Sequence, residues 1–276
     1  ATVKIGSTTF LARYAIDDNY SVFGGLNRYT LNDGDSVTTL SGYYEIDAAD
    51  KTLPTIGAAY ERKEIAMKVE LIYQPDGSVD VPTGSSLSKL IPTTPLSGAS
   101  IAFPETTTLN FQSGIAEDTL IYGTIHQGKW STAQIIVPAN PNGINPATGA
   151  ADAAVGAIGS SFDDKIHYTI GVGRKISEDL ALSISYAVED GGGAETSDPF
   201  TFRNGYETYS ISARYTAAEN LTISAGYTYT VAGDVKVVHE AAPGVPSGLT
   251  LDYTDNSCLL YTSPSPRDAT LSRMPS

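Results

Sequence analysis

The chain has 276 residues, of which 41% are hydrophobic, and its formal net charge at pH 7 is -14. This acidic balance argues against binding to nucleic acid, because phosphate recognition needs clustered lysine and arginine. No run of about eighteen apolar residues is present, so a membrane-spanning helix is excluded, whereas the strands of a membrane barrel leave a far weaker hydropathy signal.

Apolar and polar residues alternate in strand-length runs over residues 3–231. Because a strand has a side-chain period of two, each run has one apolar and one polar face. One run, for example, sets Leu182 and Ile184 against Ser183 and Ser185. In chain order the alternation predicts ten strands, at about residues 3–14, 20–31, 53–60, 64–74, 107–112, 119–136, 165–175, 180–189, 206–216 and 221–231.

The connections between these strands alternate between short and long, provided that residues 119–136 form one strand. The short ones are rich in Asp, Asn, Glu and Gly, as tight turns require; they are residues 15–19, 61–63, 113–118, 176–179 and 217–220. The long ones are residues 32–52, 75–106, 137–164, 190–205 and 232 onward. A soluble sandwich would mix connection lengths. The alternation therefore predicts an all-β, transmembrane antiparallel up-and-down barrel with short periplasmic turns and long extracellular loops.

Little in the sequence suggests catalysis. The histidines, His126, His167 and His239, lack metal-ligand spacing such as HExxH. We therefore predict no enzymatic activity, no catalytic residues, no metal and no cofactor. Lys68 and Glu70 share the polar face of one predicted strand, so they are candidates for residues that face the lumen of the barrel.

The long connection 75–106 carries more apolar residues than a solvated loop needs. Two interpretations remain open. The side chains could pack on one another as a cap, or they could line a groove that admits an apolar ligand. The candidate groove residues are Leu87, Leu90, Ile91, Leu96, Ile101 and Phe103.

The end of the chain follows a different pattern. The segment from Cys258 to Asp268 reads as the translation of a sequencing-library adapter, and residues 272–276 read as its flow-cell end. We therefore predict a partial barrel domain at residues 1–257 and an artefactual, disordered tail at residues 258–276. The only cysteine lies in this tail, so the predicted barrel has no disulfide and no Cys-ligated metal.

Several stretches are similar to one known family. They are TTLNFQSGIAEDTL at 107–120 with KWS at 129–131, IGAAYERKEIA at 56–66, and residues 168–173, 199–205, 224–229 and 233–234. Together they resemble the FadL-type outer-membrane transporters, which include long-chain fatty acid channels and TodX-type aromatic-hydrocarbon channels. The resemblance extends over about residues 3–238.

The resemblance implies a monomeric barrel of about fourteen strands, of which about ten are present here. The N-terminal hatch with its Asn-Pro-Ala signature and the first and last strands are expected to be missing. It also implies that hydrophobic substrates are captured in an outer-loop groove, enter the barrel and leave sideways at a strand kink. The connection 75–106 occupies the family's groove-forming position.

From these observations we expect a channel in the outer membrane of a Gram-negative bacterium. Its function would be passive uptake of long-chain fatty acids or aromatic hydrocarbons, and its surroundings would be outer-membrane lipid and lipopolysaccharide. A structural or adhesive barrel, or a general porin, is the alternative.

Overall fold

A computed structural model describes residues 4–32, 35–39, 42–46, 48–85, 96–137, 143–144, 151–152, 158–193, 195–196, 204–218, 221–238, 250–253 and 256–263. Strands make up almost all of this part of the chain, together with two single-turn 3₁₀ helices, η1 (Lys63–Ile65) and η2 (Trp130–Thr132). In the described residues, no helix has the length and apolar character needed to cross a membrane.

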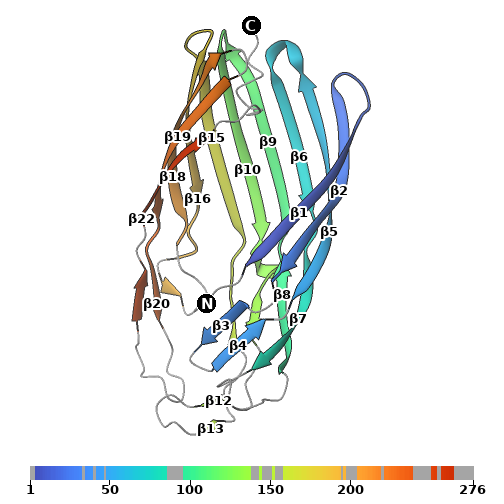
Figure 1. The fold of residues 1–276 in the computed structure, drawn as a ribbon, viewed down its shortest axis with the longest axis vertical. Helices are drawn as coiled ribbons and strands as arrows, with labels where there is room; N and C mark the ends of the chain where they lie inside the picture. The colour runs from blue at the N-terminus through green and yellow to red at the C-terminus, as the bar shows by residue number, and fades with distance from the viewer. Residues whose placement is uncertain are drawn as a thin grey trace.

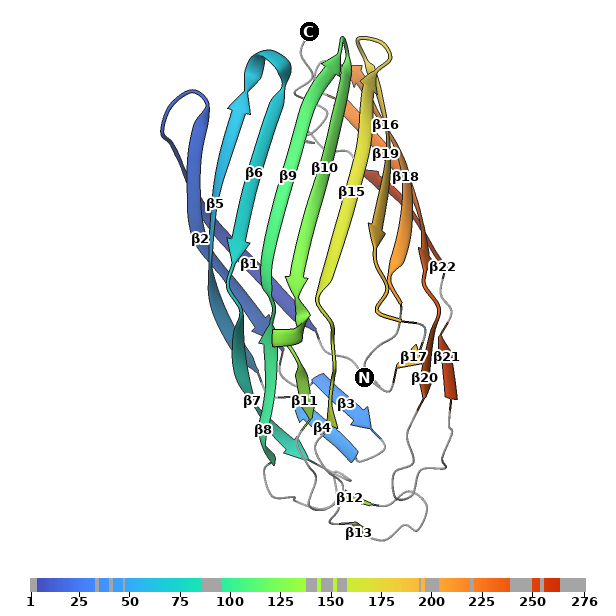
Figure 2. The same cartoon turned by 180° about the vertical axis from the view of Figure 1, so that it is seen from behind.

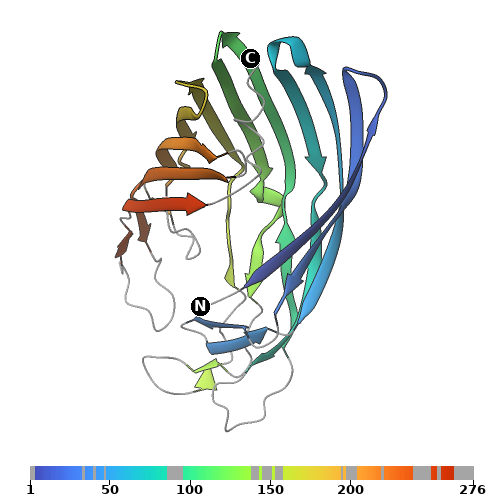
Figure 3. The same ribbon diagram turned by 45° about the horizontal axis from the view of Figure 1, so that its top comes forward.

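The main feature is a curved antiparallel sheet of eleven strands (Figure 1, Figure 2). Its order across the sheet follows the chain: β1 (Ile5–Ala15), β2 (Tyr20–Leu31), β5 (Ala49–Arg62), β6 (Met67–Gln74), β9 (Glu105–Ala116), β10 (Thr119–Lys129), β15 (Lys165–Lys175), β16 (Leu180–Glu189), β18 (Tyr206–Ala218), β19 (Leu221–Ala232) and β22 (Asn256–Ser263). This meander confirms the predicted up-and-down topology. Figure 3 shows how strongly the sheet curls. Among the described residues, the end strands β1 and β22 do not pair with each other.

The short turns gather at one end of the sheet and the long connections at the other (Figure 1). Side chains shape the short turns. In the β1–β2 turn, Asp17 Oδ1 accepts the backbone N–H of Asn19 at 2.8 Å and of Tyr20 at 2.7 Å, an Asx-type turn. Asp118, between β9 and β10, and Ala66, after η1, have positive φ angles of 55° and 48°.

The predicted strand positions are confirmed to within a few residues at each end, with one exception. The expected strand at 119–136 ends at Lys129, is interrupted by η2, and resumes as β11 (Ile135–Val137) in another sheet. Local hydrogen bonds compete with the ladder here. Thr132 Oγ1 donates to the Lys129 carbonyl at 2.9 Å, and the Ser131 N–H donates to Asp164 at 3.0 Å.

The long connections contain strands of their own, which the sequence pattern did not predict. A six-stranded sheet lies at the loop end, in the order β14 (Ile158–Gly159), β11, β8 (Leu96–Phe103), β7 (Gly77–Ser85), β4 (Gly42–Ile46) and β3 (Asp35–Thr39). Pro75 lies between β6 and β7, and Pro104 between β8 and β9. Proline has no N–H to donate to a ladder, so both prolines interrupt the hairpin where one sheet gives way to the other.

Two smaller sheets complete the loop end. One pairs β12 (Gly143–Ile144) with β13 (Ala151–Asp152), and the other joins β17 (Glu195–Thr196), β20 (Val235–Val238) and β21 (Thr250–Tyr253).

Part of the predicted tail lies in a strand. Residues 258–263 belong to β22, which pairs with β19 from Val231↔Asn256 to Ser224↔Ser263. The disorder expected for the tail stays a prediction. The open edge of β19 offers backbone donors and acceptors that this extended segment satisfies. Residues 264–276 lie outside the described part of the chain, and the artefactual origin of the tail stays a prediction.

Candidate functional site

The main sheet has two distinct faces, because residues that oppose each other in register project to the same side. Arg13 of β1 forms an ion pair with Glu70 of β6, although β2 and β5 lie between these strands. Side chains from non-adjacent strands converge in this way only on the concave side of a curved sheet. We call that side the inner face and the opposite side the outer face.

The outer face is apolar and exposed. Ile184, near the middle of β16, is 62% exposed, and Ile170 on the adjacent β15 is 50% exposed. Other exposed members of this face are Phe10, Tyr14, Val22, Leu26, Ile56, Leu71, Ile125, Ile211, Ile223 and Tyr227. A continuous apolar surface of this extent needs an apolar surrounding.

The inner face is polar, and it carries the predicted lumen residues. Lys68 Nζ lies 3.4 Å from Glu70 Oε1, the same oxygen that contacts Arg13. Two further contacts hold Arg13. Its Nη1 donates a hydrogen bond to Ser21 Oγ at 3.0 Å, and its Cζ lies 4.6 Å from the centroid of the Phe23 ring. The structure thus brings both predicted residues together with an arginine that sequence reasoning had not included. Their role in a lumen stays a prediction.

A second inner-face network surrounds Gln74, which is 8% exposed. Its Nε2 donates to the Tyr29 hydroxyl at 3.0 Å, and its Oε1 accepts from Asn27 at 3.2 Å and from Thr55 at 3.4 Å. These residues come from β2, β5 and β6, so the amide ties three strands together. A buried amide needs such partners because an unsatisfied polar group is costly.

Hydroxyl groups line the inner face further along the sheet. Cross-strand hydroxyl pairs of 2.7–3.1 Å join β16 to β18 and β18 to β19; they are Ser183–Ser212, Ser210–Thr228 and Thr208–Thr230. This part of the wall offers hydrogen bonds to water rather than an apolar path.

The histidines are held by hydroxyls rather than by a metal-like constellation. His126 Nδ1 lies 2.7 Å from Thr108 Oγ1, and His167 Nδ1 lies 2.6 Å from the Tyr206 hydroxyl. Within the residues that the structure describes, no group of His, Cys, Asp or Glu could hold a metal ion.

The candidate groove residues are only partly described. Leu87, Leu90 and Ile91 lie outside the described residues, and Leu96 is described only as the first residue of β8. Phe103 is 6% exposed and packs with Leu31, Leu53 and Val81, with Ile101 at the edge of the cluster. The Tyr29 ring stacks on Phe103 at 4.3 Å. Phe103 is thus a packed residue, and the groove stays a prediction.

A cavity of about 480 Å³ lies at the short-turn end of the sheet, lined among others by Glu61, Lys63, Ala66 and Gln112. Gln112 Nε2 donates to the Ala66 carbonyl at 3.2 Å. Glu61 and Gln112 are the register partners of Lys68 on its two neighbouring strands. The cavity therefore adjoins the Lys68–Glu70 pair.

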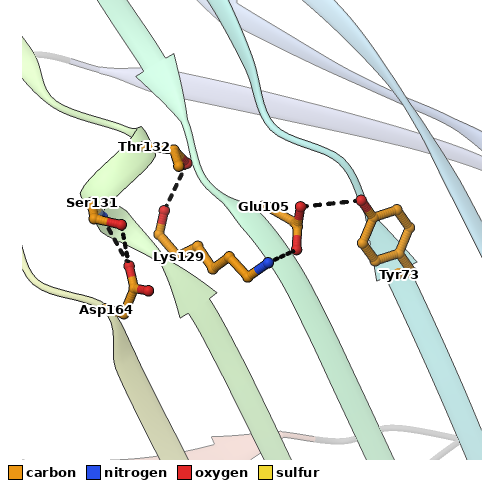
Figure 4. Close-up of polar contacts among 6 residues, drawn as sticks. All are labelled: Tyr73, Glu105, Lys129, Ser131, Thr132 and Asp164. Atoms are coloured by element: carbon orange, nitrogen blue, oxygen red, sulfur yellow. Dashed lines mark hydrogen bonds and ion pairs between the residues drawn. The ribbon is translucent and has the colours of Figure 1, made fainter.

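A polar cluster marks the point where β10 ends (Figure 4). On the outer face, Lys129 Nζ lies 2.5 Å from Glu105 Oε1, and the Tyr73 hydroxyl donates to Glu105 Oε2 at 3.2 Å. Beside them, the Ser131 hydroxyl donates to Asp164 Oδ1 at 2.6 Å. This hydrogen bond and that from the Ser131 N–H hold the pKa of Asp164 below its ordinary value.

Next to this cluster, Trp130 and Phe162 form an aromatic pair with ring centroids 6.2 Å apart. Sequence reasoning assigned them no role. The signal that could have indicated one is local: Gly128 lies in a strand two residues before the only tryptophan of the chain.

The crystal structure of a Pseudomonas aeruginosa FadL homologue matches with a TM-score of 0.65 at 12% identity, over 94% of this chain and 67% of that one. The CymD monoaromatic hydrocarbon channel matches with a TM-score of 0.51 at 13% identity, over 83% of this chain and 69% of that one. Neither protein-family models nor curated protein sequences match the chain.

The chain therefore has the fold of the FadL-type channels, as the sequence resemblance implied. It spans about two thirds of the length of each of these two proteins. At such low identity the likeness concerns the fold alone, and residue roles have to be argued from this chain.

Proposed function

We propose that the chain is part of a FadL-type channel in the outer membrane of a Gram-negative bacterium and takes up hydrophobic compounds. The observation that carries this proposal is the two-faced sheet, with exposed apolar residues outside and polar residues inside. A barrel wall in lipid requires this arrangement. Lipid and lipopolysaccharide would surround the outer face, and the protein would act as a monomer.

Transport would begin in the connection between β6 and β9, where Leu87, Leu90, Ile91, Leu96 and Ile101 would form a capture groove. Phe103 would support the groove from the packed cluster below. Since the inner wall is polar, an apolar solute gains little by moving along it. Sideways exit into acyl chains is favoured by about 0.8 kcal/mol for each buried CH₂ group. Flux would be passive, down the concentration gradient.

Uptake of labelled oleate and toluene by Gram-negative cells that express the complete protein, of which this chain is proposed to be a part, tests this function. Leu90→Asp and Ile91→Asp should lower uptake severalfold, because a charge in an apolar groove is costly. Thr93→Asp and Thr94→Asp add the same charge to polar positions of the same loop and should leave uptake unchanged. Equal effects in both pairs would exclude the groove, and no uptake above that of control cells would exclude the channel.

The polar inner face favours a second candidate, a general porin. A porin would conduct small ions through a planar bilayer in proportion to salt concentration. Steady ion conductance without hydrophobe uptake would support it over the proposed function. An adhesive barrel would show neither activity.

A further inference from the structure

Trp130 and Phe162 are far apart in sequence but meet at the loop end of the sheet. Trp130 begins η2, directly after β10, and Phe162 precedes β15. The two rings meet edge to face, with an interplanar angle of 85°. Trp130 is 41% exposed, so a large part of the indole is left uncovered by the described residues.

The contact with Gly128 shows on which side of the sheet the indole lies. This glycine opposes Thr106 and Lys165 in register, on the inner face. A Cβ at Gly128 would lie 2.8 Å from Trp130 Nε1 and 3.2 Å from Cδ1. The indole thus rests against the inner side of β10, in the space that any other residue would fill. An aromatic anchor for the lipid interface would instead need the outer face.

Gln134 holds the two aromatic segments together. Its Nε2 lies 3.0 Å from the Trp130 carbonyl and 3.0 Å from the Phe162 carbonyl, and its Oε1 accepts the Phe162 N–H at 2.8 Å. The Ser160 hydroxyl also donates to this oxygen, at 2.7 Å. The Ser131–Asp164 hydrogen bonds link the same two segments. The pair is therefore positioned before any ligand arrives, which lowers the entropic cost of binding.

We infer that Trp130 and Phe162 form a binding site for a flat, uncharged aromatic ring at the loop end of the inner face. An exposed indole with an edge-to-face neighbour can accept a third ring by offset stacking or edge-to-face contact, which an aliphatic molecule cannot match. The inference rests on the proposed function in one respect, because the bound aromatic molecule would be one of the compounds that the channel transports.

The only tryptophan of the chain reports on this site directly. The full chain in lipid nanodiscs is titrated with toluene and, separately, with methylcyclohexane, which has the same number of carbon atoms but no aromatic ring. Toluene should change Trp130 emission along a saturable curve, whereas partitioning into lipid gives a linear one. The apparent affinity for toluene should exceed that for methylcyclohexane by about two- to tenfold.

Two variants that keep the tryptophan test the geometry. Phe162→Leu should remove most of the preference for toluene, and Gly128→Ala should displace the indole, shift its emission and weaken toluene binding. Phe111→Leu is the matched control, because the Phe111 ring lies on the outer face over Gly123. If Gly128→Ala fails to fold, the preference for toluene measured in Phe162→Leu tests the inference without it.

Linear titration curves, equal affinities for the two ligands, or an unchanged preference in Phe162→Leu would overturn the inference. Oleate uptake by cells separates it from the proposed function. Uptake without saturable toluene binding leaves the channel standing and removes this site. Saturable toluene binding without uptake of any hydrophobe keeps the site and removes the transport function.

Discussion

The ring of Tyr122 on β10 lies against Gly171, the residue that opposes it on β15. A Cβ at Gly171 would come within 2.4 Å of Tyr122 Cζ. A larger residue at this position would therefore force the aromatic side chain from the next strand to move.

Gly171→Ala should lower the free energy of unfolding by about 1–3 kcal/mol, the usual cost of overpacking. Thermal or urea unfolding in lipid measures the change. Gly226→Ala is the control on the same face, because its new Cβ would meet Ser212 Cβ at 3.6 Å, an ordinary contact. Combining Gly171→Ala with Tyr122→Ala should recover part of the loss. Equal effects of the two alanine substitutions would contradict the assigned contact.

The assignment of the two faces predicts opposite outcomes for neighbouring residues. Ile184→Arg puts a charge on the outer face near the middle of β16 and should cost about 2–4 kcal/mol in a bilayer. Ser185→Arg, one residue on, puts the same charge on the inner face and should cost much less. Urea unfolding in lipid vesicles compares them. A larger loss for Ser185→Arg would reverse the faces.

The lowered pKa of Asp164 predicts that the stability of the folded protein depends on pH. Because its folded-state pKa lies below the ordinary value of 3.8, its hydrogen bonds with Ser131 stabilise the folded protein above that pH. This stability is lost as pH falls through the lower, folded-state pKa. Asp164→Asn should therefore reduce stability near neutral pH, and the difference from the unaltered protein should shrink in strong acid.

Unfolding midpoints measured across the acid range provide the test. Asp163→Asn removes the same charge one residue away and serves as the control. A difference between Asp164→Asn and the unaltered protein that stays constant with pH would exclude the titration of Asp164 as its cause.

The backbone conformation of Asp118 predicts that a glycine at this position stabilises the protein. Its φ of 55° places it in the left-handed region, which costs a non-glycine residue about 1 kcal/mol. Asp118→Gly should therefore raise the melting temperature, and Asp118→Val should lower it. Glu117→Gly, at the neighbouring position without a positive φ, should be destabilising. A lower melting temperature for Asp118→Gly would show that the aspartate side chain stabilises the turn by more than the strain costs.

Strand positions, faces and turn locations could be predicted from the sequence, because they depend on local periodicity. The runs predicted at 165–175 and 180–189 coincide with β15 and β16. Lys68 and Glu70 could be assigned to one face for the same reason. Arg13 could not be added to them, since its contact with Glu70 crosses two strands and depends on the curvature of the sheet.

Side-chain alternation and turn residues act over a few neighbours, so an antiparallel meander with one apolar and one polar face could be predicted from the amino acids alone. The end of β10, the pairing of β22 with β19 and the packing of Phe103 became known from the three-dimensional structure. It alone brought Phe162 to Trp130 through Gln134. These outcomes depend on hydrogen bonds and packing between segments distant in the chain, which local periodicity does not encode.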